Sequence, residues 1–167
     1  MTDIDDIAAR LRRLEDEHDI AQLIASYGLA VDAANADGAA ALWSEDGSYD
    51  VEDWNMQSQA DVHAMVSSTF HRDLVSKGCC HFIGPSVVTV GGDEAVAISE
   101  SLVLVRDGAG YRVWRATANH FELRRIDGRW RISRRTSRVL DGQPGAHALL
   151  RSGLAGAVAP ALGEAAT

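Results

Sequence analysis

A short apolar run at residues 79–84 carries a histidine that could act as a general base. The run reads CCHFIG, follows the turn signal KG and ends in GP. It is too short for a helix and predicts a strand in which His81 shares one face with Cys79 and Ile83. An imidazole on an inward face needs a partner, because burying a polar group alone costs several kcal/mol. His81 is therefore either a satisfied core residue or a base with a partner elsewhere.

A second group with useful chemistry is Asp32, near the C-terminal end of a helix expected over residues 16–35. Apolar residues at Ile20, Leu23, Ile24, Tyr27 and Val31 form one stripe of that helix. Asp32 lies beside the stripe, within reach of whatever the stripe covers. The helix dipole disfavours a carboxylate at this end, so its placement has a small cost. The alternative is an exposed aspartate at a helix terminus.

Two large aromatic residues, Tyr49 and Trp54, flank a loop after a short strand expected over residues 48–51. Their apolar bodies and polar tips suit the rim of a small-molecule pocket, although both could equally be core residues.

The totals limit the class of protein. A chain of 167 residues fits one domain, expected over residues 1–145, followed by a segment at 146–167 that forms a short helix or lid and then a frayed tail. The net charge of −8 argues against nucleic acid or an anionic membrane as partner. Fifteen arginines against one lysine suggest a GC-rich bacterial genome.

The cysteines Cys79 and Cys80 are adjacent, so a disulfide between them would be strained. Reduced thiols and a cytoplasmic location are expected. We expect no metal site, because zinc-type spacing is missing, and no membrane span, because no apolar run approaches the ~20 residues required.

Helices are expected over residues 4–14, 16–35, 39–43 and 59–76, the last with His63 and His71 facing solvent. From residue 80 the apolar period changes to two, which predicts strands over 80–90, 95–106, 111–125 and 130–140 joined by glycine-rich turns. These elements predict an α+β fold: a cone-shaped α+β barrel in which a curved antiparallel meander sheet wraps around the N-terminal helices, with a pocket at the open end.

Together, the helix with Tyr27 and Asp32, the strand at His81 and the meander ending in RIDGRWRI resemble the nuclear transport factor two-like superfamily. The likeness covers roughly residues 16–141 and is greatest to the scytalone dehydratase-like and polyketide cyclase-like branch. Bile-acid dehydratases and hexachlorocyclohexane dehydrochlorinase are similar as well.

The resemblance implies roles for individual residues. His81 matches the catalytic histidine of scytalone dehydratase, and Asp32 falls where its aspartate partner lies. Thr117 and Asn119 fall at polar pocket positions, and Cys79 resembles a pocket cysteine of the dehydrochlorinase. The spacing of Tyr27 and Asp32 resembles that of bile-acid dehydratases. Tyr27 or Tyr49 could hold a hydroxyl group of the substrate or supply a proton.

There are also departures. Scytalone dehydratase has a second active-site histidine on the second strand of the meander. In this chain, residues 104–107 of that strand read LVRD and contain no histidine. Val31 replaces a tyrosine, and His120 has the opposite phase to Asn119, so it should point away from the cavity. These differences argue against scytalone itself as the substrate.

The combined expectation is a cofactor-independent lyase of dehydratase or elimination type, in which Asp32 and His81 act by general acid–base chemistry on a small hydrophobic cyclic substrate. One alternative is a non-catalytic ligand-binding or assembly module of the same fold. Another is a polyketide cyclase or ketosteroid-type isomerase. We also expect a homo-oligomer, either a dimer or a trimer.

Overall fold

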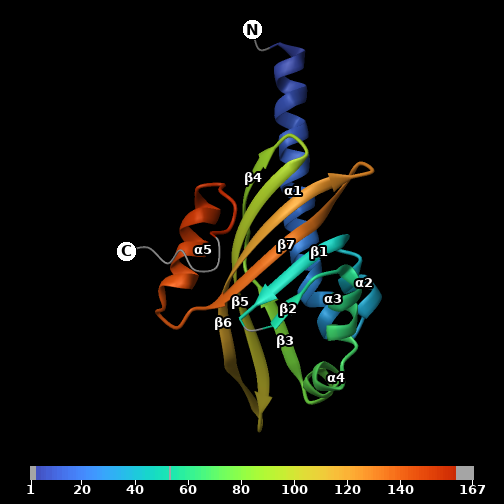
Figure 1. Cartoon of the computed structure of the whole chain (residues 1–167), viewed down its shortest axis with the longest axis vertical. Helices are drawn as coiled ribbons and strands as arrows, with labels where there is room; N and C mark the ends of the chain where they lie inside the picture. Colours follow the sequence, from blue (N-terminus) through green and yellow to red (C-terminus); the bar gives the residue numbers. More distant parts are fainter. Residues whose placement is uncertain (1–2, 53, 161–167) are drawn as a thin grey trace.

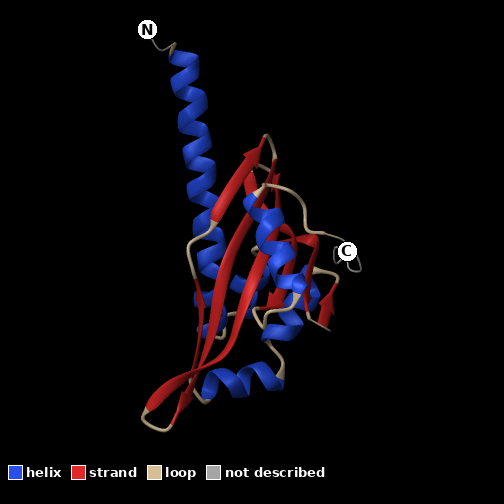
Figure 2. Cartoon of the chain, turned by 90° about the vertical axis from the view of Figure 1, so that its left-hand side faces the viewer, coloured by secondary structure: helices blue, strands red, loops and turns tan. Residues whose placement is uncertain are grey.

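The fold is organised around one long helix, α1 (Ile4–Asp32), in a computed structural model that describes residues 3–52 and 54–160. The two helices expected over 4–14 and 16–35 are therefore continuous. The second half of α1 lies against the sheet and buries the stripe ending at Tyr27 and Val31. The first half projects beyond the sheet, as Figures 1 and 2 show. Among the described residues, no helix combines the length and apolar character needed to cross a membrane.

One curved sheet contains all seven described strands, in the order β2-β1-β7-β6-β5-β3, with β4 also pairing with β5. The strands are β1 (Trp43–Val51), β2 (Trp54–Met56), β3 (Cys79–Ile83), β4 (Val87–Gly91), β5 (Glu94–Asp107), β6 (Gly110–Ile126) and β7 (Arg129–Val139). The sheet is open, and the pairing of β1 with β7 is parallel. The expected α+β cone is confirmed, but the sheet is mixed rather than wholly antiparallel.

The strand expected over 80–90 is divided into β3 and β4, both of which pair with β5. Pro85 lies in the gap, and a proline has no N–H to donate to a ladder, so the pairing breaks there. By contrast, the expected β6–β7 hairpin forms as predicted. Asp127 and Gly128 both adopt positive φ, at 48° and 75°, as a two-residue type I′ turn requires.

Three short helices, α2 (Ala36–Ala40), α3 (Gln59–Val66) and α4 (Thr69–Ser76), lie beside the C-terminal end of α1. The helix expected over 59–76 is interrupted at Ser67 and Ser68. Ser68 begins α4 as its N-cap, because its Oγ accepts the backbone N–H of His71 at 3.2 Å. The break changes which residues of α4 face inward.

The sheet buries both of its faces. The main core lies between the sheet and helices α1 to α3 and includes Trp43, Phe121 and Ile132. On the other face lies α5 (Pro144–Leu154), with Ala118, Ala146 and Leu149 in a smaller cluster. No described residue of α5 lines the main cavity. The end of the expected frayed tail, residues 161–167, lies outside the described residues.

Candidate active site

The carboxylate of Asp32 holds His81 at two points. The Oδ1 atom of Asp32 lies 2.7 Å from the ring Nδ1 of His81, and Oδ2 accepts the backbone N–H of His81 at 2.8 Å. Asp32 is the last residue of α1 and His81 is the central residue of β3. A carboxylate acceptor requires the proton of a neutral imidazole to be on Nδ1, which leaves Nε2 as the free acceptor. This is the arrangement of a poised general base.

A glycine allows α1 and β3 to approach closely enough for these bonds. A Cβ at Gly28, one turn before Asp32, would overlap the backbone carbonyl oxygen of His81. Any side chain at this position would push the strand away from the helix. Gly28 is thus a positioning residue for the Asp32–His81 pair, although it has no functional group.

Cys79 completes the hydrogen bonding of Asp32. Its Sγ lies 3.6 Å from Asp32 Oδ1 and 3.9 Å from His81 Nδ1. Burial, and next the charge of Asp32, raise the pKa of the Cys79 thiol to about 11. The thiol therefore remains protonated near neutral pH and can donate to the carboxylate.

Asp32, Cys79 and His81 are also close enough together to be considered as metal ligands. The chemistry of the set argues against that use. The 2.7 Å separation of Asp32 and His81 is a hydrogen-bond distance, and a metal would need the thiolate form of Cys79. The trio instead fits a hydrogen-bonded carboxylate with three donors.

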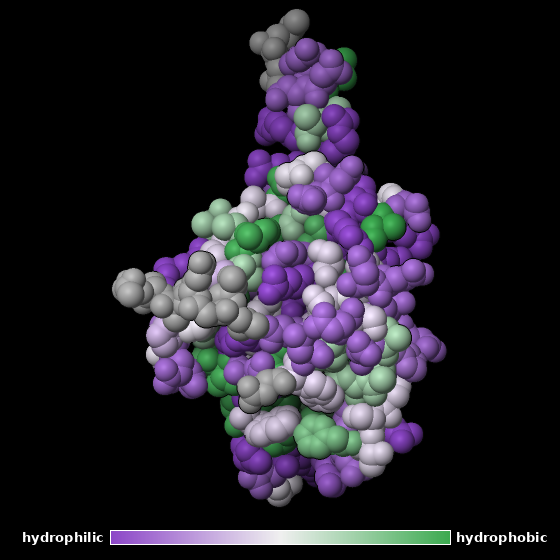
Figure 3. All heavy atoms as spheres, viewed as in Figure 1, coloured by the Kyte–Doolittle hydropathy of each residue, from purple (hydrophilic) through white to green (hydrophobic). Residues whose placement is uncertain are grey.

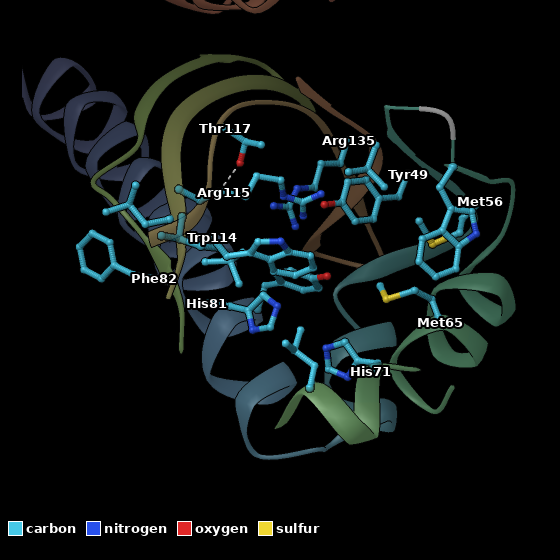
Figure 4. A pocket seen from close by; sticks show the side chains of 18 of the residues that line it. Tyr49, Met56, Met65, His71, His81, Phe82, Trp114, Arg115, Thr117 and Arg135 are labelled. Atoms are coloured by element: carbon cyan, nitrogen blue, oxygen red, sulfur yellow. Dashed lines mark hydrogen bonds between the residues drawn. The ribbon is translucent and has the colours of Figure 1, made fainter. Parts of the chain in front are cut away.

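His81 opens onto a cavity of about 270 Å³ between the sheet and the short helices. Figure 4 shows side chains from several elements converging on it. The lining is mainly apolar and aromatic, including Met56, Met65, Leu74 and Trp114. Polar groups come from Ser101, Thr117, Arg115 and Arg135. An apolar cavity with a few converging polar groups is typical of a small-molecule site.

The most unusual cation of this cavity is Arg135, which is only 3 % exposed. Its guanidinium carbon lies 4.6 Å and 4.5 Å from the ring centres of Tyr27 and Tyr49. Its Nη2 donates to the neutral side chain of Asn119, but among the described residues Nε and Nη1 have no hydrogen-bond partner. A buried cation held by rings and an amide retains the capacity to stabilise negative charge in the cavity.

Asn119 belongs to a polar network beneath the cavity. Its Oδ1 accepts from Arg135 and from Ser137, each at 2.7 Å. Its Nδ2 donates to Ser101 Oγ at 2.9 Å, and Ser101 bonds Thr117 at 2.7 Å. Asn119 is fully buried and does not line the cavity. Asn119 on β6 therefore holds the guanidinium of Arg135 in place through hydrogen bonds that link β5, β6 and β7.

The residues proposed from the sequence fall into two groups. Tyr27, Tyr49, Trp54, His81 and Thr117 line the cavity. Asp32, Cys79 and Asn119 support residues that do, without lining it themselves. Burial, and next the neighbouring Tyr49, raise the pKa of Tyr27 well above its ordinary value, so its phenol remains a hydrogen-bond donor. His120 points to the opposite face, where Nε2 lies 2.8 Å from the carbonyl oxygen of Ala157.

The expectation that His71 faces solvent is wrong. The break at Ser67 and Ser68 changes the phase of α4, so His71 is 6 % exposed while the preceding Phe70 is 61 % exposed. The ring of His71 lies over that of His81, with centroids 5.5 Å apart. Three consecutive capping residues, at positions 67–69, are the sequence signal that could have revealed the break.

Arg135 was not singled out from the sequence because a β-bulge changes the phase of β7. Leu123 pairs with Ile132 but Glu122 pairs with Arg134, so Ser133 is an extra residue in the ladder. Ile132 is buried before the bulge, and Arg135 faces inward after it. Strict alternation along the strand would have put these two residues on opposite faces.

Comparison with known proteins identifies the family of this chain. The SnoaL-like domain matches residues 12–136. The chain belongs to this family. The SnoaL-like domain thus covers both Asp32 and His81 and extends to Arg135. Among curated protein sequences, none matches the chain.

Solved structures share the fold of this SnoaL-like protein. An NTF2-like protein with a cystatin-like fold from Novosphingobium aromaticivorans is 40 % identical, with 90 % of this chain and 98 % of that chain covered and a TM-score of 0.87. The hexachlorocyclohexane dehydrochlorinase LinA-type3 from Novosphingobium barchaimii is 21 % identical, with 78 % and 90 % covered and a TM-score of 0.67. A candidate scytalone dehydratase from N. aromaticivorans is 17 % identical, with 76 % and 85 % covered and a TM-score of 0.63.

Proposed function

We propose that this SnoaL-like protein is a cofactor-independent lyase that eliminates water from a small, largely apolar cyclic substrate. The proposal rests on one observation: the 2.7 Å bond between Asp32 and His81 at the wall of an apolar cavity. Asp32 orients the ring and stabilises the imidazolium, and Nε2 of His81 takes a proton from the substrate. Relatives of the same fold carry names of a dehydrochlorinase and a candidate dehydratase, both of which denote elimination chemistry.

The remaining cavity residues support the same reaction. Removal of a proton next to a carbonyl places negative charge on the carbonyl oxygen. The partly unpaired guanidinium of Arg135 can stabilise this charge, and the protonated phenol of Tyr27 can donate a hydrogen bond to it. The electron pair of the C–H bond forms the double bond, and the C–O bond to the hydroxyl breaks. The departing oxygen takes the abstracted proton back from the imidazolium of His81 and leaves as water.

The test is a product assay with small cyclic β-hydroxyketones, followed through the ultraviolet absorbance of the conjugated enone. We expect His81→Ala to reduce turnover by about 10²–10⁴-fold, the usual contribution of a general base. Asp32→Asn should reduce it as well, whereas His63→Ala, an exposed histidine of α3, should not. Full turnover by His81→Ala would refute the proposed role of this residue.

The same assay separates the two alternatives. An isomerase or cyclase would convert its substrate without the loss of water that mass spectrometry detects for a dehydratase. A binding module would retain its ligand and release no product in either the parent protein or His81→Ala. The buried polar network around Asn119 would serve either alternative as a rigid binding surface.

We further propose that the chain self-associates through the projecting end of α1. Figure 3 shows that this end carries mostly hydrophilic side chains. Ile4, Ile7, Leu11 and Leu14 nevertheless form an exposed apolar stripe with the 3-4-3 spacing of a coiled-coil seam. Leu11→Asp should shift the sedimentation coefficient towards that of the monomer, while Ala9→Asp on the opposite side of the helix should not. Identical sedimentation of both variants and the parent protein would exclude this interface.

A cytoplasmic location stays a prediction.

A further inference from the structure

His71 is a buried histidine that the reaction described above does not use. It lies on α4, is 6 % exposed and lines the same cavity as His81. Figure 4 shows the two rings in the same region of the cavity wall. Within the described residues, neither Nδ1 nor Nε2 of His71 makes a hydrogen bond. The position of the residue is nevertheless fixed, since Ser68 Oγ accepts its backbone N–H.

A buried imidazole with two unused nitrogen atoms is costly unless a bound molecule satisfies it. The loss of one hydrogen bond from a buried polar group costs about 1–3 kcal/mol. Neighbouring side chains are mainly apolar, and the Val66 carbonyl that acts on the ring makes no hydrogen bond with it, so the available partner would be a polar group of a molecule inside the cavity. This feature therefore points to a ligand that carries a hydroxyl or carbonyl group near His71.

The charges around His71 favour its neutral form. His81 on β3 is a titratable neighbour whose ring centroid lies 5.5 Å from that of His71, and Asp32 on α1 binds the His81 ring. Arg115 and Arg135 line the same cavity from β6 and β7. On α4 itself, residues 72 and 73 are charged and exposed.

The pKa of His71 agrees with this distribution of charge. Burial, and next His81, lower the pKa of His71, while the Val66 carbonyl and Asp32 act in the opposite direction. Near neutral pH the ring is thus neutral and has one N–H donor and one lone pair, neither of which has a partner among the described residues.

We propose that His71 is a second substrate-contacting residue, whose neutral ring hydrogen-bonds the leaving hydroxyl of a cyclic alcohol; this inference rests on the proposed lyase function. His81 takes the proton from carbon, the C–H electron pair forms the double bond and the C–O bond breaks. The departing oxygen then recovers that proton from the imidazolium of His81 and leaves as water. His71 neither gains nor loses a proton, and its hydrogen bond holds the hydroxyl next to His81.

The first part of the test uses 2-naphthol as the probe, because its ring hydroxyl can bind but cannot be eliminated. Isothermal calorimetry near neutral pH measures binding to the parent protein and three variants. His71→Leu should bind about tenfold more weakly, the loss expected for one hydrogen bond in a buried site. His71→Gln should remain within about twofold, since its amide can still donate and accept. The control, His63→Gln, should bind like the parent protein.

The second part needs no variant at His71 and so does not depend on the folding of one. In protein labelled with ¹⁵N-histidine, 2-naphthol should shift the ring resonances of His71, and His81→Gln should raise the pH at which they titrate. Unchanged resonances, undiminished binding by His71→Leu, equal losses in the Leu and Gln variants, or no binding by the parent protein would each overturn the proposal. If the His71 effects occur but no elimination is found, the contact stands and the proposed function fails.

Discussion

At the scale of single residues, Asp32 accepts three donors and leaves Nε2 of His81, a residue of the cavity wall, as the free acceptor. Two donors come from the backbone and ring of His81, and the third is the thiol of Cys79. A carboxylate with this many donors is poorly suited to attack a substrate and well suited to orient an imidazole. The role of Cys79 follows from its protonation state, which can be measured directly.

We predict that Cys79 reacts slowly with iodoacetamide, in a Cys80→Ala background that leaves one cysteine. Because burial and next Asp32 raise the pKa of the Cys79 thiol to about 11, the reactive thiolate should become abundant only as the pH approaches that value. Asp32→Asn removes the carboxylate charge and should increase the alkylation rate at about pH 9 several-fold. Alkylation as fast as that of an unfolded thiol in the parent background would contradict this account.

At the scale of elements, the sequence predicted the apolar period and the order of the helices and strands well. It did not predict which face a side chain occupies after an irregularity in its element. Asp32 and His81 come before any break in their elements, and the structure places them in contact. His71 and Arg135 follow a helix break and a bulge, and each irregularity rotates every later side chain of its element. The parallel pairing of β1 with β7 depends on contacts distant in sequence, which local patterns do not encode.

The close approach of α1 and β3 at Gly28 gives a prediction for Gly28→Ala. The added methyl group would overlap the carbonyl of His81, and forcing extra volume into a packed region costs about 1–3 kcal/mol. This loss should exceed the gain of up to ~1 kcal/mol in helix propensity. Urea unfolding should therefore show lower stability, and ¹⁵N spectra should show a weakened bond to His81 Nδ1.

The control for this change is Gly91→Ala on β4. An added Cβ there has its nearest neighbour, the carbonyl oxygen of Glu94, at 4.0 Å, so stability should change by no more than ~0.5 kcal/mol. If Gly28→Ala were as stable as Gly91→Ala, with the His81 resonances unchanged, Gly28 would not be what positions the pair.

At the scale of the whole molecule, both faces of the sheet bury a histidine away from water. His71 lies on the cavity side, and His120 lies under the C-terminal segment on the other side, where its Nδ1 has no partner among the described residues. Burial is the main cause that lowers the pKa of both, and for His71 the neighbouring His81 adds to it. Protonation of either ring is thus coupled to unfolding of the domain.

We therefore predict that the free energy of unfolding decreases as the pH falls below about 6.5, the ordinary histidine value. Above this pH both rings are neutral in the folded and unfolded chains and contribute no pH dependence. Below it the unfolded chain binds protons that the folded chain does not, so stability is lost until the pH reaches the lowered folded values. Each histidine contributes at most about 1.4 kcal/mol per pH unit.

Urea unfolding of His71→Gln and His120→Gln between about pH 7.5 and 5 should each give a flatter dependence than the parent protein, with His63→Gln as the exposed control. Parallel curves for all four proteins would show that neither buried ring is held neutral by the fold.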